Sequence, residues 1–232
     1  MKALFTFTLA LLACCSSQQN DVMTTDPITT RHTFTFLSLG DSYTIGESVP
    51  EADRWSVQLA KMLRNEGVDV AAPEIIARTG WTTDELQTAI KASNNQKTYS
   101  LVSLLIGVNN QYRGQTLETY RTEFRELLQT ATRYAGGNAG RVFILSIPDW
   151  GVSPFAQGRD RRKIAAEIDA FNAVAQEEAA KLNIAYIDIT TTSRTAAGDP
   201  SQIASDGLHF SGQQYRQWAE QALPVVKTLL AK

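Results

Sequence analysis

The chain has 232 residues, of which 43% are hydrophobic and 20% are charged, and its formal net charge is −2. This balance leaves no excess of Lys and Arg to support nucleic-acid binding. With only two histidines, a histidine-rich metal site is excluded. Both cysteines, Cys14 and Cys15, lie near the N-terminus, so the remainder of the chain has no disulfide, thiol nucleophile or cysteine metal ligand.

Residues 1–13 have the features of an export signal. Lys2 gives a short basic start, residues 3–13 form an apolar run, and Leu-Leu-Ala-Cys, ending at Cys14, matches a bacterial lipobox. The run is shorter than the about 20 residues that span a bilayer. We therefore predict a lipoprotein signal peptide and lipidation of Cys14, which imply an exported lipoprotein anchored in a membrane of the bacterial cell envelope. The alternatives are an ordinary secretory signal cleaved near Ala13 and a buried segment.

Residues 14–32 are polar and lack periodicity, so we predict a flexible tether. The alternative is a partly ordered arm packed on the domain. From residue 33 onward there is no internal repeat or low-complexity tract. We therefore predict one domain over residues 33–232, which is large enough to bury a core without disulfides.

This domain alternates apolar, strand-like runs with amphipathic, helix-like ones, which predicts βαβ units and a parallel sheet. The runs at 99–106 and 142–147 are apolar without clean alternation, as in strands covered on both faces. Strands are expected at 33–39, 73–78, 99–106, 141–147 and 183–189.

Polar residues mark the starts of several expected helices. Thr82 and Glu85 form a capping-box pattern, and Thr116 and Ser211 precede apolar stripes at helical spacing. Pro224 is expected to kink or restart the last helix.

Ligands of an open α/β sheet bind beyond the carboxyl ends of its strands. Ser42, Gly80 and Asn109 each lie within a few residues of such an end, on three different strands. They are therefore expected to converge at one edge of the sheet.

Two short segments far apart in the sequence carry the chemistry: Gly-Asp-Ser-Tyr, which contains Ser42, and Asp-Gly-Leu-His, from Asp206 to His209. A serine becomes a nucleophile when a neighbouring base removes its proton, and a carboxylate orients that base. The other histidine, His32, lies at the tether boundary. The aspartates that compete with Asp206 for the orienting role are Asp41, Asp149 and Asp188. Thr44 replaces the second glycine of Gly-x-Ser-x-Gly, which argues against an α/β-hydrolase elbow.

These segments, with two further blocks, resemble the SGNH (GDSL-type) hydrolase superfamily. The blocks are Gly40–Tyr43, Gly80, the Gly-Val-Asn sequence ending at Asn109, and Asp206–His209, in the order of the family. The resemblance covers roughly residues 33 to 230. It implies a three-layer α/β/α sandwich with a five-stranded, flavodoxin-like parallel sheet.

The resemblance also implies the roles of the residues. Ser42 is the expected nucleophile, His209 the general base and Asp206 its orienting acid. The oxyanion would be bound by the backbone N–H groups of Ser42 and Gly80 and by the side-chain amide of Asn109.

The sequence departs from the family pattern at two positions. Asn110 and Phe210 stand where the family often has aspartate and proline. These departures put substrate detail in doubt rather than the chemistry.

Five aromatic residues fall on loops at the same edge and could line the acyl or alcohol site, or could pack as satellite core. They are Tyr43, Trp81, Tyr112, Trp150 and Phe155. The basic run 159–163 is interpreted as a solvated helix start rather than an anion site.

The expected function is hydrolysis of carboxylic esters through an acyl-serine, without metal or cofactor. Short-chain acyl or acetyl esters are favoured, with carbohydrate deacetylation first, because no lid domain is available to wall a deep acyl tunnel. A lysophospholipase or thioesterase is the alternative within the enzymes. From another class, the chain could be a non-catalytic, glycan-binding surface lipoprotein. The substrate would be a small acylated sugar or a lipid-like ester.

Overall fold

Five parallel strands form the central sheet, as the sequence predicts. Their order is β2-β1-β3-β4-β5, so β1 pairs with a strand on each side. The observed strands fall close to the predicted runs and are shorter. Their bounds are β1 Phe36–Gly40, β2 Glu74–Ala77, β3 Leu101–Leu105, β4 Val142–Leu145 and β5 Ala185–Ile187.

The computed structural model describes the first residue and residues 33–231. The predicted signal peptide, the lipidation site Cys14, the tether and His32 lie outside the described residues. Among the described residues, no helix is long and apolar enough to cross a membrane.

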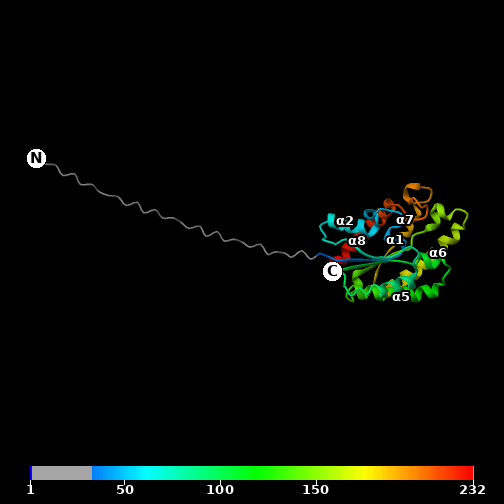
Figure 1. Ribbon diagram of the computed structural model, residues 1–232, viewed down its shortest axis with the longest axis horizontal. Coiled ribbons are helices and arrows are strands. Elements are labelled where there is room, and N and C mark those ends of the chain that lie inside the picture. The colour runs from blue at the N-terminus through cyan, green and yellow to red at the C-terminus, as the bar shows by residue number, and fades with distance from the viewer. Residues whose placement is uncertain (2–32, 232) are drawn as a thin grey trace. The chain divides into compact units, whose positions relative to one another are not determined.

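Helices cover both faces of the sheet and complete a three-layer α/β/α sandwich (Figure 1). Helices α2 and α8 pack against each other on one face, and α5 lies between α3 and α6 on the other. The α-helices are α1 Ser42–Ile45, α2 Trp55–Asn65, α3 Thr83–Ala92, α4 Val108–Tyr112, α5 Leu117–Tyr134, α6 Arg161–Lys181, α7 Thr190–Arg194 and α8 Gly212–Leu230. Short 3₁₀ turns are η1 Glu51–Asp53, η2 Ala139–Arg141, η3 Trp150–Val152, η4 Pro154–Ala156 and η5 Pro200–Gln202.

The predicted helix caps are confirmed. Thr82 forms a capping box with Glu85, and the side chains of Thr116 and Ser211 each accept a hydrogen bond from a backbone N–H in the first turn. A restart at Pro224 does not occur, because α8 continues through it to Leu230. The helix face beyond the proline stays buried, which compensates for the hydrogen bond that proline cannot donate.

The carboxyl ends of the three strands that carry the first three sequence blocks lie side by side. Gly40 of β1 is paired with Ala77 of β2 and with Leu105 of β3. A Cβ at position 40 would lie 2.2 Å from Oγ1 of Thr44 and 2.3 Å from the backbone oxygen of Leu105. Only glycine therefore lets α1 fold back so tightly over the end of β1.

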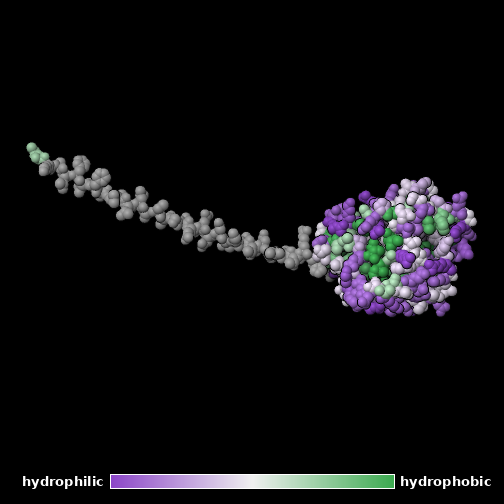
Figure 2. All heavy atoms as spheres, viewed as in Figure 1, coloured by the Kyte–Doolittle hydropathy of each residue, from purple (hydrophilic) through white to green (hydrophobic). Residues whose placement is uncertain are grey.

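Aromatic side chains fill much of the space between the sheet and the layer formed by α2 and α8. Trp55 packs edge-on against Phe36 and Phe143, and Trp218 packs against Tyr215. All five are buried. The outer surface is mainly hydrophilic on the side seen in Figure 2, where apolar side chains gather over the sheet between the helical layers.

Candidate active site

Ser42 begins α1, immediately after β1. Asp41 caps this helix, because its Oδ1 accepts a hydrogen bond of 3.0 Å from the backbone N–H of Tyr43. The turn ends at Gly46, whose φ of 68° favours glycine. Ser42 is only 4% exposed and lines a pocket. The strand, the cap and the turn thus fix the backbone of Ser42 at the wall of this pocket.

Asp206 and His209 lie together on the loop before α8. Oδ2 of Asp206 is 2.6 Å from Nδ1 of His209, and its Oδ1 accepts hydrogen bonds of 2.9 Å from the backbone N–H groups of Leu208 and His209. Gly207 has φ of 72°, which lets the loop turn tightly enough for these contacts. With Nδ1–H donated to the carboxylate, the lone pair of Nε2 is available as a base.

A second side chain holds the same carboxylate. Ser48 Oγ donates a hydrogen bond of 2.8 Å to Oδ2 of Asp206. Burial raises the pKa of Asp206, but the hydrogen bonds from His209, Leu208 and Ser48 outweigh it and lower this pKa to about 2. The carboxylate therefore stays ionised at neutral pH. Ser48 has φ of 64°, an unusual backbone conformation for a non-glycine residue.

The competing aspartates have other partners. Asp149 forms an ion pair of 2.9 Å with Nε of Arg194, and Asp188 accepts a hydrogen bond of 2.9 Å from the hydroxyl of Thr191. Asp41 bonds the backbone of its own turn. Among the described aspartates, Asp206 is the one paired with His209.

Asp41 is fully buried beside the proposed nucleophile. Burial raises the pKa of its carboxyl to about 7, although hydrogen bonds from its own turn act in the opposite direction. Its Oδ2 has no hydrogen-bond partner among the described residues. This carboxyl is therefore partly protonated near neutral pH.

The donors expected for an oxyanion converge on the same pocket. Ser42, Gly80 and Asn109 all line it. The backbone N–H groups of Ser42 and Gly80 donate no hydrogen bond to another described residue. Nδ2 of Asn109 donates a hydrogen bond of 2.9 Å to the backbone oxygen of Trp81, which fixes the amide and leaves its second hydrogen for a ligand.

Arg113 supports the side of the pocket that contains Gly80. This role could not be predicted from the sequence. Its Nη2 donates a hydrogen bond of 2.6 Å to the backbone oxygen of Gly80, while its Nη1 pairs with Glu85 at 3.1 Å. The guanidinium thus ties the glycine turn to α3. Gly80 itself has φ of 87°, which explains the residue type.

The two departures from the family pattern have structural roles. The buried Asn110 donates hydrogen bonds of 2.6 Å to the side chains of Thr83 and Gln115, and it accepts one from the backbone N–H of Thr83. Phe210 is fully buried against Trp218. Since neither residue lines the pocket, the departures bear on how the loops are held rather than on the lining of the substrate site.

The pocket has a volume of about 190 Å³. Four of the five predicted aromatics line it, namely Tyr43, Tyr112, Trp150 and Phe155. Trp81 is not among the lining residues, because its side chain packs against the core. Tyr112 and Phe155 are 48% and 42% exposed. They form an open aromatic rim, whereas Tyr43 and Trp150 are buried.

Arg159 lies on this rim, and its position there could not be predicted from the sequence. Asp160 caps α6, so the predicted helix start in the run 159–163 is confirmed. The guanidinium carbon of Arg159 lies 5.3 Å, 5.4 Å and 5.0 Å from the ring centres of Tyr112, Trp150 and Phe155.

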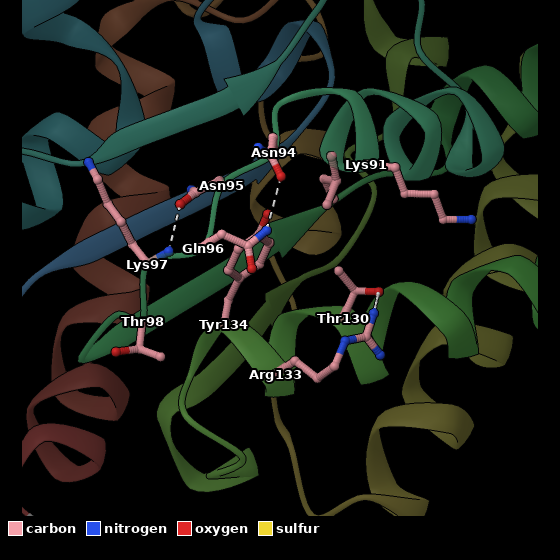
Figure 3. A pocket seen from close by; sticks show the side chains of 10 residues that line it. Lys91, Asn94, Asn95, Gln96, Lys97, Thr98, Thr130, Arg133 and Tyr134 are labelled. Atoms are coloured by element: carbon pink, nitrogen blue, oxygen red, sulfur yellow. Dashed lines mark hydrogen bonds between the residues drawn. The ribbon is translucent and has the colours of Figure 1, made fainter.

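A larger cavity of about 310 Å³ lies at the other end of the sheet, near the amino end of β3. Residues 94–98, which precede β3, line part of it (Figure 3). Its side chains bond one another, as Arg133 does with Thr130. It holds no serine–histidine pair. Across the described part of the chain, no cluster of His, Cys, Asp and Glu is suited to a metal ion.

Comparisons with known proteins agree with this geometry. Residues 38–217 match the model of the GDSL-like lipase/acylhydrolase family. No curated protein matches the sequence. Among solved structures, TesA is 22% identical with a TM-score of 0.66, over 84% of this chain and 99% of that chain.

Two other solved structures are similar at lower identity. The psychrotrophic esterase EstA from Pseudoalteromonas sp. is 15% identical with a TM-score of 0.66, over 86% of this chain and 100% of that chain. The acetyl xylan esterase Axe2 from Geobacillus stearothermophilus is 16% identical with a TM-score of 0.65, over 83% of this chain and 94% of that chain. At these identities the likeness establishes the fold.

Proposed function

Because the chain belongs to the GDSL-like lipase/acylhydrolase family and is a carboxylic ester hydrolase, we propose that Ser42, His209 and Asp206 are its catalytic residues. One observation carries this proposal. The serine and the histidine line one pocket, and the histidine is fixed by a carboxylate 2.6 Å from its Nδ1. An imidazole oriented in this way, in the same pocket as a serine, can act as the base that removes the proton of its hydroxyl.

In the proposed first half-reaction, Ser42 Oγ attacks the ester carbonyl carbon while Nε2 of His209 takes its proton. The tetrahedral intermediate then collapses, the bond to the alcohol oxygen breaks, and His209 returns the proton to the departing alcohol. The second half-reaction repeats these steps with water as the nucleophile and releases the carboxylic acid. Asp206 holds the imidazole in the required tautomer and stabilises its charged form.

The negative charge on the carbonyl oxygen would be bound by the N–H groups of Ser42 and Gly80 and by the amide of Asn109. Support comes from the two backbone donors, which donate no hydrogen bond to another described residue. Donors that are already fixed need no reorganisation as the charge develops.

We also propose that the substrates are short-chain acyl esters, with acetylated carbohydrates favoured. The pocket volume of about 190 Å³ suits a small acyl group rather than a long chain. The rings of Tyr112 and Phe155 are partly exposed, and the parts that Arg159 leaves uncovered can contact a sugar ring. A lysophospholipid or thioester substrate remains an outcome of the test.

Labelling with a fluorophosphonate tests the catalytic assignment. We expect covalent modification at Ser42, together with hydrolysis of p-nitrophenyl acetate. Ser42→Ala should abolish labelling. His209→Ala should lose nearly all activity, and the double variant should be little worse than either, because the two residues act as one unit. A glycan-binding protein without catalysis would stay unlabelled.

The natural substrate class can be identified with acetylated sugars, lysophospholipids and acyl thioesters. Release of acetate from the sugars is expected to be fastest. Faster turnover of a lysophospholipid or thioester would contradict the carbohydrate assignment while leaving the catalytic residues in place.

A further inference from the structure

Arg159 occupies an unusual place beside the catalytic pocket. Its guanidinium lies 5.0–5.4 Å from the centres of three rings, those of Tyr112, Trp150 and Phe155. All three rings line the pocket that also contains Ser42. Arg159 itself is exposed and does not line the cavity, so it lies on the rim, against the aromatic wall.

Arg159 forms no ion pair with a described residue, and the carboxylate of its neighbour Asp160 accepts a hydrogen bond from the backbone N–H of Lys163. The one side-chain hydrogen bond that its guanidinium donates, at 3.3 Å, goes to the hydroxyl of Tyr112. Arg113, on the other side of the pocket, differs because it is paired with Glu85. The site is thus flanked by one neutralised arginine and one unpaired cation.

The guanidinium is also held in place before any ligand arrives. Its contacts with the three rings and its hydrogen bond to Tyr112 restrain the guanidinium, and no other hydrogen bond joins it to a described residue. The backbone N–H of Arg159 donates to the oxygen of Ala156 at 3.1 Å, and Asp160 caps the following helix. Restraint of this kind lowers the entropy lost when a ligand binds.

We propose that Arg159, unlike the rest of the run 159–163, binds an anion, which reverses the interpretation from the sequence at this position. The anionic group is a carboxylate or phosphate carried by the ester substrate where it extends beyond the pocket. The inference rests on the proposed function, since it assigns a substrate feature to the same site. A guanidinium edge matches the paired oxygens of both anions. Arg159 would therefore determine specificity, favouring charged esters over neutral ones of the same shape.

Matched pairs of substrates test this proposal and show which part of the substrate carries the charge. In the first pair, acetoxyphenylacetate carries a carboxylate on the alcohol portion and acetoxyphenylacetamide is its neutral counterpart. In the second, acetyl glycerophosphate carries a phosphate there and acetyl glycerol does not. In the third, the p-nitrophenyl monoester of glutarate carries a carboxylate on the acyl portion and p-nitrophenyl pentanoate is neutral. The kcat/KM of each substrate is measured for the wild type, R159Q and R159K.

The wild type should prefer the charged member of at least one pair. R159Q should lower kcat/KM for that member about fivefold, as for an exposed ion pair, with the neutral partner changed less than about twofold. R159K should keep part of the preference, and added salt should weaken it. The control is R162Q, which removes an exposed cation of the same helix start and should leave every ratio unchanged.

Two results would overturn the inference: equal losses on charged and neutral esters in R159Q, which would assign Arg159 to holding the rings, or no preference for charge in any pair. Failure of the proposed function would look different. In that case wild-type Ser42 would resist fluorophosphonate, and even neutral esters would not be hydrolysed.

Discussion

Ser48 donates a hydrogen bond of 2.8 Å to Asp206, which lies 158 residues further along the chain. The acceptor is the same oxygen that contacts Nδ1 of His209. Ser48 therefore helps to fix the carboxylate that orients the proposed base, and its own φ is positive. It acts through Asp206 and is a positioning residue.

Ser48→Ala should lower kcat about fivefold with little change in KM, because a hydrogen bond of about 1 kcal/mol that orients Asp206 is lost. Steady-state kinetics on p-nitrophenyl acetate measure this effect. Ser48→Gly is the matched control, since it relieves the positive φ but also lacks the hydroxyl. Full activity in the glycine variant would contradict a role for the hydroxyl.

Asn109→Ala should lower kcat by about 10²–10³ with KM nearly unchanged, because a donor to the developing negative charge is removed. The same kinetics test it, with circular dichroism to establish folding. If only KM rises, Asn109 binds substrate without stabilising the transition state.

The rate on p-nitrophenyl esters should be highest from acetate to butyrate and fall for longer acyl chains. The pocket of about 190 Å³ is small and has an exposed aromatic rim, so methylenes far from the ester would stay largely in water. A burying tunnel would gain about 0.8 kcal/mol, or nearly fourfold in kcat/KM, for each CH₂. The series should be measured below the micelle concentration. A steady rise to about ten carbons at that increment would indicate a lipid substrate.

Asp41→Asn should become more stable relative to the wild type as pH rises from 4 to 7. Burial raises the pKa of Asp41 from 3.8 to about 7. Between these values the unfolded state releases the proton while the folded state retains it, so wild-type stability falls with pH by at most a few kcal/mol. Urea unfolding of both proteins at several pH values measures the difference between their free energies of unfolding. A difference independent of pH would show that the carboxyl has an ordinary pKa.

Cys14 should carry a lipid, as the lipobox predicts. Wild-type protein expressed in a bacterial host should then partition with membranes, and Cys14→Ala should not. Mass spectrometry of the N-terminus identifies the modification. Wholly soluble wild-type protein with an unmodified terminus would disprove the anchor.

The sheet and the strand-end residues could be predicted because their signals are local. Apolar runs mark the strands, and parallel strands bring their carboxyl ends to one edge, so Ser42, Gly80 and Asn109 meet in one pocket. The Asp206–His209 pair could also be predicted from the sequence, because both residues lie on one short turn.

The supporting residues could not be predicted, because their partners are distant in sequence. Nothing in the spacing pairs Ser48 with Asp206, or Arg159 with the aromatic rim. For Trp81 the sequence leaves the pocket wall and the satellite core as alternatives. In the structure the ring packs against the core, and its backbone oxygen accepts the hydrogen bond of Asn109.

The proposed active site brings together two residues, Ser42 and His209, that are separated by most of the sequence of the domain. Ser42 follows β1, which lies between β2 and β3, whereas His209 precedes α8, which packs against α2. Contacts of such long sequence separation form late and slowly during folding. The two halves of the catalytic apparatus therefore meet only when the last helix has docked. During refolding, esterase activity should therefore return only when folding is complete. A chain truncated before α8 should be inactive even if its sheet has formed.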